Sequence, residues 1–83
     1  MSFKEEVIEL LCNTAKSLFD VDDSILNENT RFVEDLHCKS IDMIKFTSEL
    51  EDEYDAEVPY MAFNRNKTFG EAAEFMSKLT GYE

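Results

Sequence analysis

The chain has 83 residues with 43% hydrophobic and 12% aromatic side chains, which predicts one folded domain over residues 1–83. Nineteen acidic residues against eight basic ones leave a formal net charge of −11. Such a surface repels nucleic acid and anionic membranes and favours a protein partner with a basic patch, although an excess of acids also serves solubility.

The sequence also restricts the compartment and the metal chemistry. No apolar run approaches the length of a membrane-spanning helix, and the acidic N-terminal residues differ from the basic start of a signal peptide. We therefore expect a cytoplasmic protein, and we expect a monomer. One histidine and two distant cysteines, Cys12 and Cys38, do not make a zinc site, and both thiols are expected to be free.

The first predicted helix covers residues 3–18. Ser2 and Glu5 have the spacing of a capping box, in which each side chain satisfies an amide at the start of the helix. Apolar side chains then recur at helical spacing and form one stripe: Phe3, Val7, Ile8, Leu11, Ala15 and Leu18.

Residues 20–39 are predicted to form a long loop, because aspartate and asparagine residues that favour turns are frequent in its first half. Isolated apolar residues are expected to anchor it to the helices: Val21, Ile25, Leu26, Phe32, Val33 and Leu36. A loop of this length in a compact domain is usually functional or disordered, and the anchors favour a function.

The second helix is predicted to begin at Ser40 as its N-cap, with Asp42 in the first turn. Its core face comprises Met43, Phe46, Thr47, Leu50 and Tyr54. After Pro59, residues 60–63 are expected to form one short helical turn.

Thr68 and Glu71 have the spacing of another capping box, and the last helix should end near Gly81. Its predicted stripe comprises Phe69, Ala72, Phe75, Met76 and Leu79. The fold class is therefore all-α: a small antiparallel four-helix bundle, with three main helices, one short helix and a long first loop.

Two surface features of the second helix indicate contact with partners. Ile41 and Ile44 fall off the core face and form an exposed apolar patch, unless a loop anchor such as Leu36 covers them. Residues 49–57 are rich in acids, which lie unfavourably near the negative end of the helix dipole. Local stability does not explain these acids, so they either dock a basic partner or form a solvated face.

Ser40 has two interpretations that local spacing does not separate. It is either a plain N-cap or an attachment point, where a phosphodiester would lie beside the unpaired amides of a helix N-terminus.

Three other kinds of functional site match the sequence poorly. Asp20, Asp22 and Ser24 begin like a calcium loop, but its sixth and twelfth positions do not match. No nucleophile elbow surrounds Ser40 to pair it with His37, and Cys38 lacks a CxxC partner.

The order of these motifs resembles the acyl carrier protein family. The stretch Asn-Thr-Arg-Phe-Val-Glu-Asp-Leu at residues 29–36, followed by Ser40-Ile41-Asp42, is similar to the family's core. The match continues through the acids from Glu49 to Asp55, the Val58-Pro59 pair and the helix opened by Thr68, so it covers nearly the whole chain.

This resemblance implies that Ser40 bears 4′-phosphopantetheine, transferred from coenzyme A by a phosphopantetheinyl transferase. The protein would then be a carrier without a catalytic site, holding acyl groups as thioesters in fatty-acid, polyketide or related synthesis. Its partners would be acyl-handling enzymes with basic docking patches. The surface expected to meet them comprises Lys39, Ile41, Asp42, Ile44, Lys45, Glu49, Glu51 and Asp52.

The sequence departs from the family's pattern at three positions. The usual motif Asp-Ser-Leu reads Lys39-Ser40-Ile41 here, in which isoleucine for leucine is a mild change and lysine for aspartate is not. Lys45 also stands where an acid is common. These departures suggest a specialised member rather than a housekeeping carrier. The alternative function is an unmodified helical module whose acidic face binds a basic protein.

Overall fold

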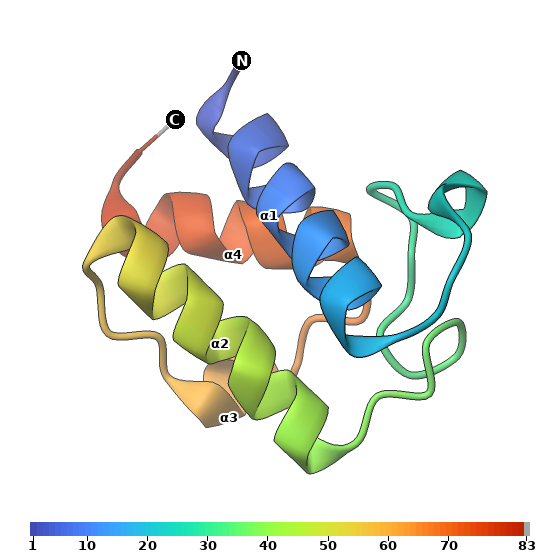
Figure 1. Ribbon diagram of the computed structural model, residues 1–83. Helices are drawn as coiled ribbons and strands as arrows, with labels where there is room; N and C mark the ends of the chain where they lie inside the picture. The colour runs from blue at the N-terminus through green and yellow to red at the C-terminus, as the bar shows by residue number, and fades with distance from the viewer. Residues whose placement is uncertain (83) are drawn as a thin grey trace.

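The computed structural model describes residues 1–82 and contains, within them, four α-helices and one short 3-10 helix (Figure 1). The helices are α1 (Phe3–Leu18), α2 (Ser40–Tyr54), α3 (Tyr60–Phe63) and α4 (Phe69–Thr80), with η1 (Asp23–Ile25) in the long loop. The predicted all-α class is confirmed, whereas η1 had no counterpart in the sequence prediction. None of these helices is long and apolar enough to cross a membrane.

The start of α1 forms the predicted capping box. The Glu5 amide donates to Ser2 Oγ at 3.2 Å, and the Ser2 amide donates to Glu5 Oε1 at 3.0 Å. The helix packs mainly against α4 and less extensively against α2. At its first turn the Phe3 ring contacts the rings of Tyr54, at the end of α2, and Tyr82, beyond α4, with centroids 4.9 and 5.2 Å apart.

The buried face of α4 differs from the predicted stripe, and the predicted Phe75 is only half-buried. Phe69, Ala72 and Met76 are buried as expected, and Ala73 joins them. Leu79 is 39% exposed, because a stripe through Ala73 and Met76 continues at position 80 in a helix of 3.6 residues per turn. The half-buried Thr80 takes that place, and its hydroxyl donates to the Met76 carbonyl at 2.8 Å.

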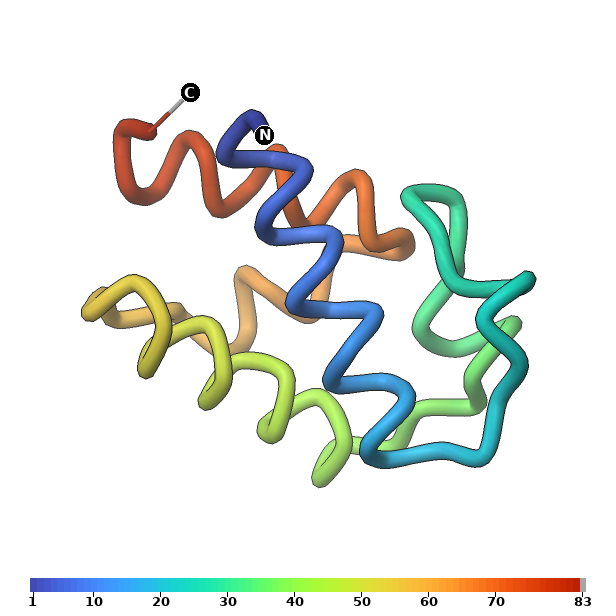
Figure 2. The backbone as a smooth tube through the Cα atoms, turned by 45° about the horizontal axis from the view of Figure 1, so that its top comes forward, coloured from blue at the N-terminus to red at the C-terminus, as the bar shows by residue number. Residues whose placement is uncertain are grey.

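The long loop is tied to the segment that opens α4. The Phe69 amide donates to the Thr30 carbonyl at 3.0 Å, and the Phe32 amide donates to the Lys67 carbonyl at 3.0 Å. The Gly70 amide donates to the Glu28 carbonyl at 2.8 Å, and a Cβ at position 70 would lie 3.0 Å from that oxygen. The loop therefore lies beside the start of α4, as Figure 2 shows.

Phe32 is the loop residue that completes the core. It is 1% exposed, and its ring contacts those of Phe46, Phe63 and Phe69 with centroids 5.2, 5.8 and 4.9 Å apart. Leu36 is buried as well, and Val21 and Leu26 are partly buried against the core, so four of the six predicted anchors are confirmed.

Val33 and Ile25 do not anchor the loop as expected, because they are 59% and 42% exposed. Residues 31–37 form a helix-like turn, in which the His37 amide donates to the Val33 carbonyl at 2.9 Å. In such a turn Phe32 and Leu36, four residues apart, share the inner face and Val33 points outward.

Candidate functional site

Ser40 is exposed and is the first residue of α2, not its N-cap. The N-cap is Lys39, whose amide donates to Asp42 Oδ2 at 2.9 Å. The predicted N-cap role of Ser40 is therefore wrong by one position, because the carboxylate of Asp42 satisfies the cap amide instead. Within the described residues, no side chain caps this helix end by accepting from its first-turn amides. The Ser40 hydroxyl therefore does not cap the helix.

The amides of the first turn of α2 make this end of the helix favourable for an anion. An α-helix leaves its first amides without carbonyl partners inside the helix, and its dipole places partial positive charge there. A phosphodiester on the Ser40 oxygen would meet both features. The residues at this position therefore fit a phosphate-linked group.

A cavity of about 210 Å³ opens beside Ser40. Its walls come from three segments: Phe32 in the long loop, Lys39 and Met43 at the start of α2, and Lys67 before α4. Phe32 and Met43 are 1% and 6% exposed, so its deeper side is apolar. Pockets that bury a drug-sized ligand measure about 300–1,000 Å³, so this one has room for part of an extended molecule.

The basic residues of the molecule fall into two groups. Four form ion pairs: Lys4 with Glu74, Lys16 with Asp23, Arg31 with Asp35, and Lys78 with Glu74. Among residues 1–82, the other four form none: Lys39, Lys45, Arg65 and Lys67. Two of these four, Lys39 and Lys67, line the cavity beside Ser40.

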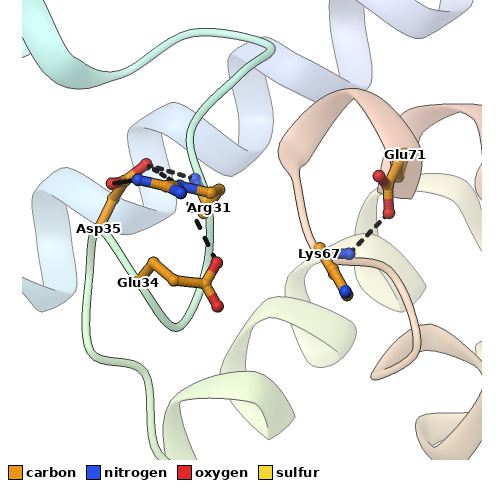
Figure 3. A network of polar contacts seen from close by, with 5 residues as sticks. All are labelled: Arg31, Glu34, Asp35, Lys67 and Glu71. Atoms are coloured by element: carbon orange, nitrogen blue, oxygen red, sulfur yellow. Dashed lines mark hydrogen bonds and ion pairs between the residues drawn. The ribbon is translucent and has the colours of Figure 1, made fainter.

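Figure 3 contrasts a paired and an unpaired cation near this cavity. Arg31 Nη2 lies 3.0 Å from Asp35 Oδ1, and the hydrogen bonds from Arg31 hold the pKa of the Asp35 carboxyl below its usual value. Lys67 meets Glu71 only through its backbone, since its amide donates to Glu71 Oε1 at 2.8 Å. Its ammonium group points away from that carboxylate (Figure 3).

The apolar patch is exposed as predicted. Ile41 and Ile44 are 63% and 51% exposed, so Leu36 does not cover them. Lys45 and Glu49 are also exposed on α2.

The acids of α2 do not all behave as expected. Asp52 is exposed, but Glu51 is half-buried, and its Oε2 accepts a hydrogen bond from the Val58 amide at 2.9 Å. The prediction that local structure gives these acids no role is therefore wrong for Glu51. Its carboxylate fastens the connection between α2 and α3, a bond across seven residues that no helical period could indicate.

Cys38 and His37 have no chemical role that the geometry supports. Burial, and secondarily the charge of Asp42, raises the pKa of the Cys38 thiol to about 12, so the thiol stays protonated at neutral pH. His37 is exposed and adopts a left-handed backbone conformation with φ of 56°. Within the described residues, no cluster of His, Cys, Asp and Glu could hold a metal ion.

Sequence reasoning missed Lys67, together with Asn64 and Asn66, which also line the cavity. These residues lie more than 20 positions from Ser40, and only the folded chain brings them to it. One signal was present: residues 64–67 read Asn-Arg-Asn-Lys and hold two of the eight basic residues of an acidic chain.

The sequence was compared with protein-family models and with known proteins. Residues 9–76 match the family model described as "Phosphopantetheine attachment site". The chain is 35% identical over 78 residues to the acyl carrier protein of Lactobacillus acidophilus, covering 94% of this chain and 98% of that protein. It is 29% identical to the acyl carrier protein of Lactobacillus johnsonii (88% and 91% covered) and 26% identical to that of Picosynechococcus (93% and 95% covered). The chain belongs to the acyl carrier protein family.

Proposed function

We propose that this protein carries acyl groups, for fatty-acid, polyketide or related synthesis, on a 4′-phosphopantetheine arm attached to Ser40. The observation that carries the assignment is the position of Ser40: an exposed serine at the first turn of α2, with no capping duty, in a chain that matches a phosphopantetheine attachment model. When bound, the arm supplies a thiol that holds the acyl group as a thioester.

The chain's own residues act as a tether and a docking surface. Ser40 holds the arm, and the first-turn amides of α2 stabilise the phosphate charge beside it. Ile41 and Ile44 offer apolar contact next to the attachment point. We assign the chain no catalysis of its own. Its contribution is to present a tethered substrate, which reaches a high effective concentration at each docked enzyme without tight binding.

The partners we propose are a phosphopantetheinyl transferase and acyl-handling enzymes with basic patches. Glu49 and Asp52, both exposed on α2, would steer such partners and speed their encounter. Lys39 and Lys45 are exposed where a housekeeping carrier commonly has acids, so we propose that the transferase and enzymes of a specialised pathway recognise them.

The test is the intact mass of the protein after incubation with coenzyme A and a promiscuous transferase. Wild type should gain the mass of one phosphopantetheinyl group. Ser40→Ala should gain none and remain helical by circular dichroism, while Ser48→Ala, an exposed serine on the same helix, should load like wild type. Modification of Ser40→Ala would assign the wrong residue, and an unmodified wild type would favour the unmodified interaction module.

A further inference from the structure

Among residues 1–82, two lysines that form no ion pair line one cavity together with Ser40. Lys39 precedes Ser40 in the chain, whereas Lys67 reaches the cavity from the segment before α4. The hydrogen bond between the Phe32 amide and the Lys67 carbonyl, 3.0 Å long, ties this segment to the long loop. The fold itself therefore places the second positive charge.

This placement is unexpected in a chain with 19 acids. Two like charges that share a cavity repel each other, and the available carboxylates do not neutralise them. Glu34 also lines the cavity, but its carboxylate lies 3.9 Å from Arg31 Nε. The carboxylates of Asp42 and Glu71 accept from the backbone amides of Lys39 and Lys67 and form no ion pair with their ammonium groups. Both lysines are exposed, so their ammonium groups are available to an anion from outside the described residues.

We propose that Lys39 and Lys67 bind the phosphodiester of the arm attached to Ser40 and so direct the first part of the arm across the cavity. The inference rests on the proposed function, because the anion is the one that modification would add. Lysine ammonium groups bind phosphate oxygens through strong, charge-assisted hydrogen bonds. The cavity of about 210 Å³ holds part of the arm against Phe32 and Met43 and leaves its thiol end outside.

The experiment compares wild type with Lys39→Gln/Lys67→Gln, each loaded with phosphopantetheine by the promiscuous transferase and checked by intact mass. The control variant, Lys45→Gln/Arg65→Gln, removes the same charge from two unpaired cations that do not line the cavity. The readout is the ³¹P resonance of the phosphodiester, its chemical shift and its transverse relaxation, at low and high salt.

In wild type and in the control variant, the ³¹P resonance should differ from that of the same protein unfolded in urea. In Lys39→Gln/Lys67→Gln it should move toward the unfolded position and relax more slowly, and salt should shift it less. The single variant Lys67→Gln should show part of this change, although residue 67 is remote from Ser40 in sequence.

Identical ³¹P shifts and relaxation in wild type and Lys39→Gln/Lys67→Gln would overturn the inference while leaving the attachment at Ser40 intact. Equal changes in the control variant would also overturn it, because net charge alone would then be responsible. A wild-type protein that never loads would overturn both proposals, and the intact-mass measurement identifies that case before any spectrum is recorded.

Discussion

The two ends of α2 carry opposite charge, in an arrangement that the helix itself does not favour. The N-terminal end has Lys39 as its N-cap and Ser40 beside a cavity that Lys67 also lines. The C-terminal end has the acids Asp52 and Glu53 exposed in its last turns. A helix dipole favours acids at the start and bases at the end, so most of these charges do not serve helix stability.

The comparison teaches that helix stability does not explain the exposed charges at either end. Under the proposed function, the positive end would meet the phosphodiester on Ser40 and the negative end would meet a basic protein surface. The exceptions support this view, since Asp42 and Glu51 are the two acids of α2 that bond backbone amides at 2.9 Å. Within one helix, acids that hold the fold and acids that face solvent can therefore be told apart by their hydrogen bonds.

The largest effect on the free energy of unfolding should come from removing Phe32, whose ring lines the cavity at the positive end of α2. Phe32→Ala deletes a ring that is 1% exposed and contacts three other phenylalanines, so it should cost about 3–5 kcal/mol of unfolding free energy. That is a large part of the roughly 5–15 kcal/mol of a small domain. Urea denaturation followed by circular dichroism measures it. The neighbour Val33→Ala, 59% exposed, should change the free energy by less than about 0.5 kcal/mol, and equal costs would contradict the core position of Phe32.

A smaller effect should separate the two kinds of acid at the negative end. Glu51→Ala leaves the Val58 amide without its acceptor and should cost about 1–3 kcal/mol of unfolding free energy. Glu51→Gln should lose less, because its amide oxygen still accepts. Asp52→Ala, an exposed neighbour, should be neutral or slightly stabilising. Urea midpoints of the three variants test this, and matching midpoints for Glu51→Ala and Asp52→Ala would contradict the structural role.

The exposed acids should instead affect association with a partner enzyme. Glu49→Gln/Asp52→Gln should keep the wild-type urea midpoint but slow association at low salt by roughly twofold to tenfold, and its rate should depend less on salt. Stopped-flow association with a cognate enzyme at several salt concentrations measures this. Glu9→Gln/Asp20→Asn removes the same charge from exposed residues that do not belong to α2. If both variants slow equally, net charge and not the acidic end of α2 steers the partner.

The smallest expected effect concerns Arg31, the paired cation near the positive end. Its hydrogen bonds lower the pKa of Asp35 in the folded state, so their stabilising contribution is complete above the unfolded pKa of about 3.9. That contribution is lost as pH falls through the lower, folded pKa. The difference in urea midpoint between wild type and Arg31→Gln should therefore shrink from pH 6 toward pH 2. Arg65→Gln, which removes an unpaired cation, should show no such trend.

Sequence reasoning was most successful where the determinants are local. The bounds of α1 and α3 follow from a capping box and from Pro59, and the exposure of Ile41 and Ile44 follows from helical angle alone. The N-cap of α2 was misplaced because lysine is a poor capping residue by its side chain, and here only its backbone amide is capped, by Asp42.

The remaining gaps have a common physical origin: contacts between segments far apart in the chain. The cavity wall at Lys67 and the bond between Glu51 and Val58 depend on how the loop and the α2–α3 connection lie in space. A single sequence carries no periodic signal for such contacts. The pattern of charges was visible from the start, but the distinction between paired and unpaired bases required the fold.

The protonated Cys38 has a consequence for the selectivity of thiol chemistry on the loaded carrier. Cys38 lines the cavity beside Ser40, yet its pKa of about 12 keeps its reactive thiolate scarce at neutral pH. Burial also raises the pKa of Cys12. In a loaded protein, electrophiles would thus react at the thiol of the arm in preference to Cys38, and the Cys38 thiol would compete little as a nucleophile for an acyl group held on the arm.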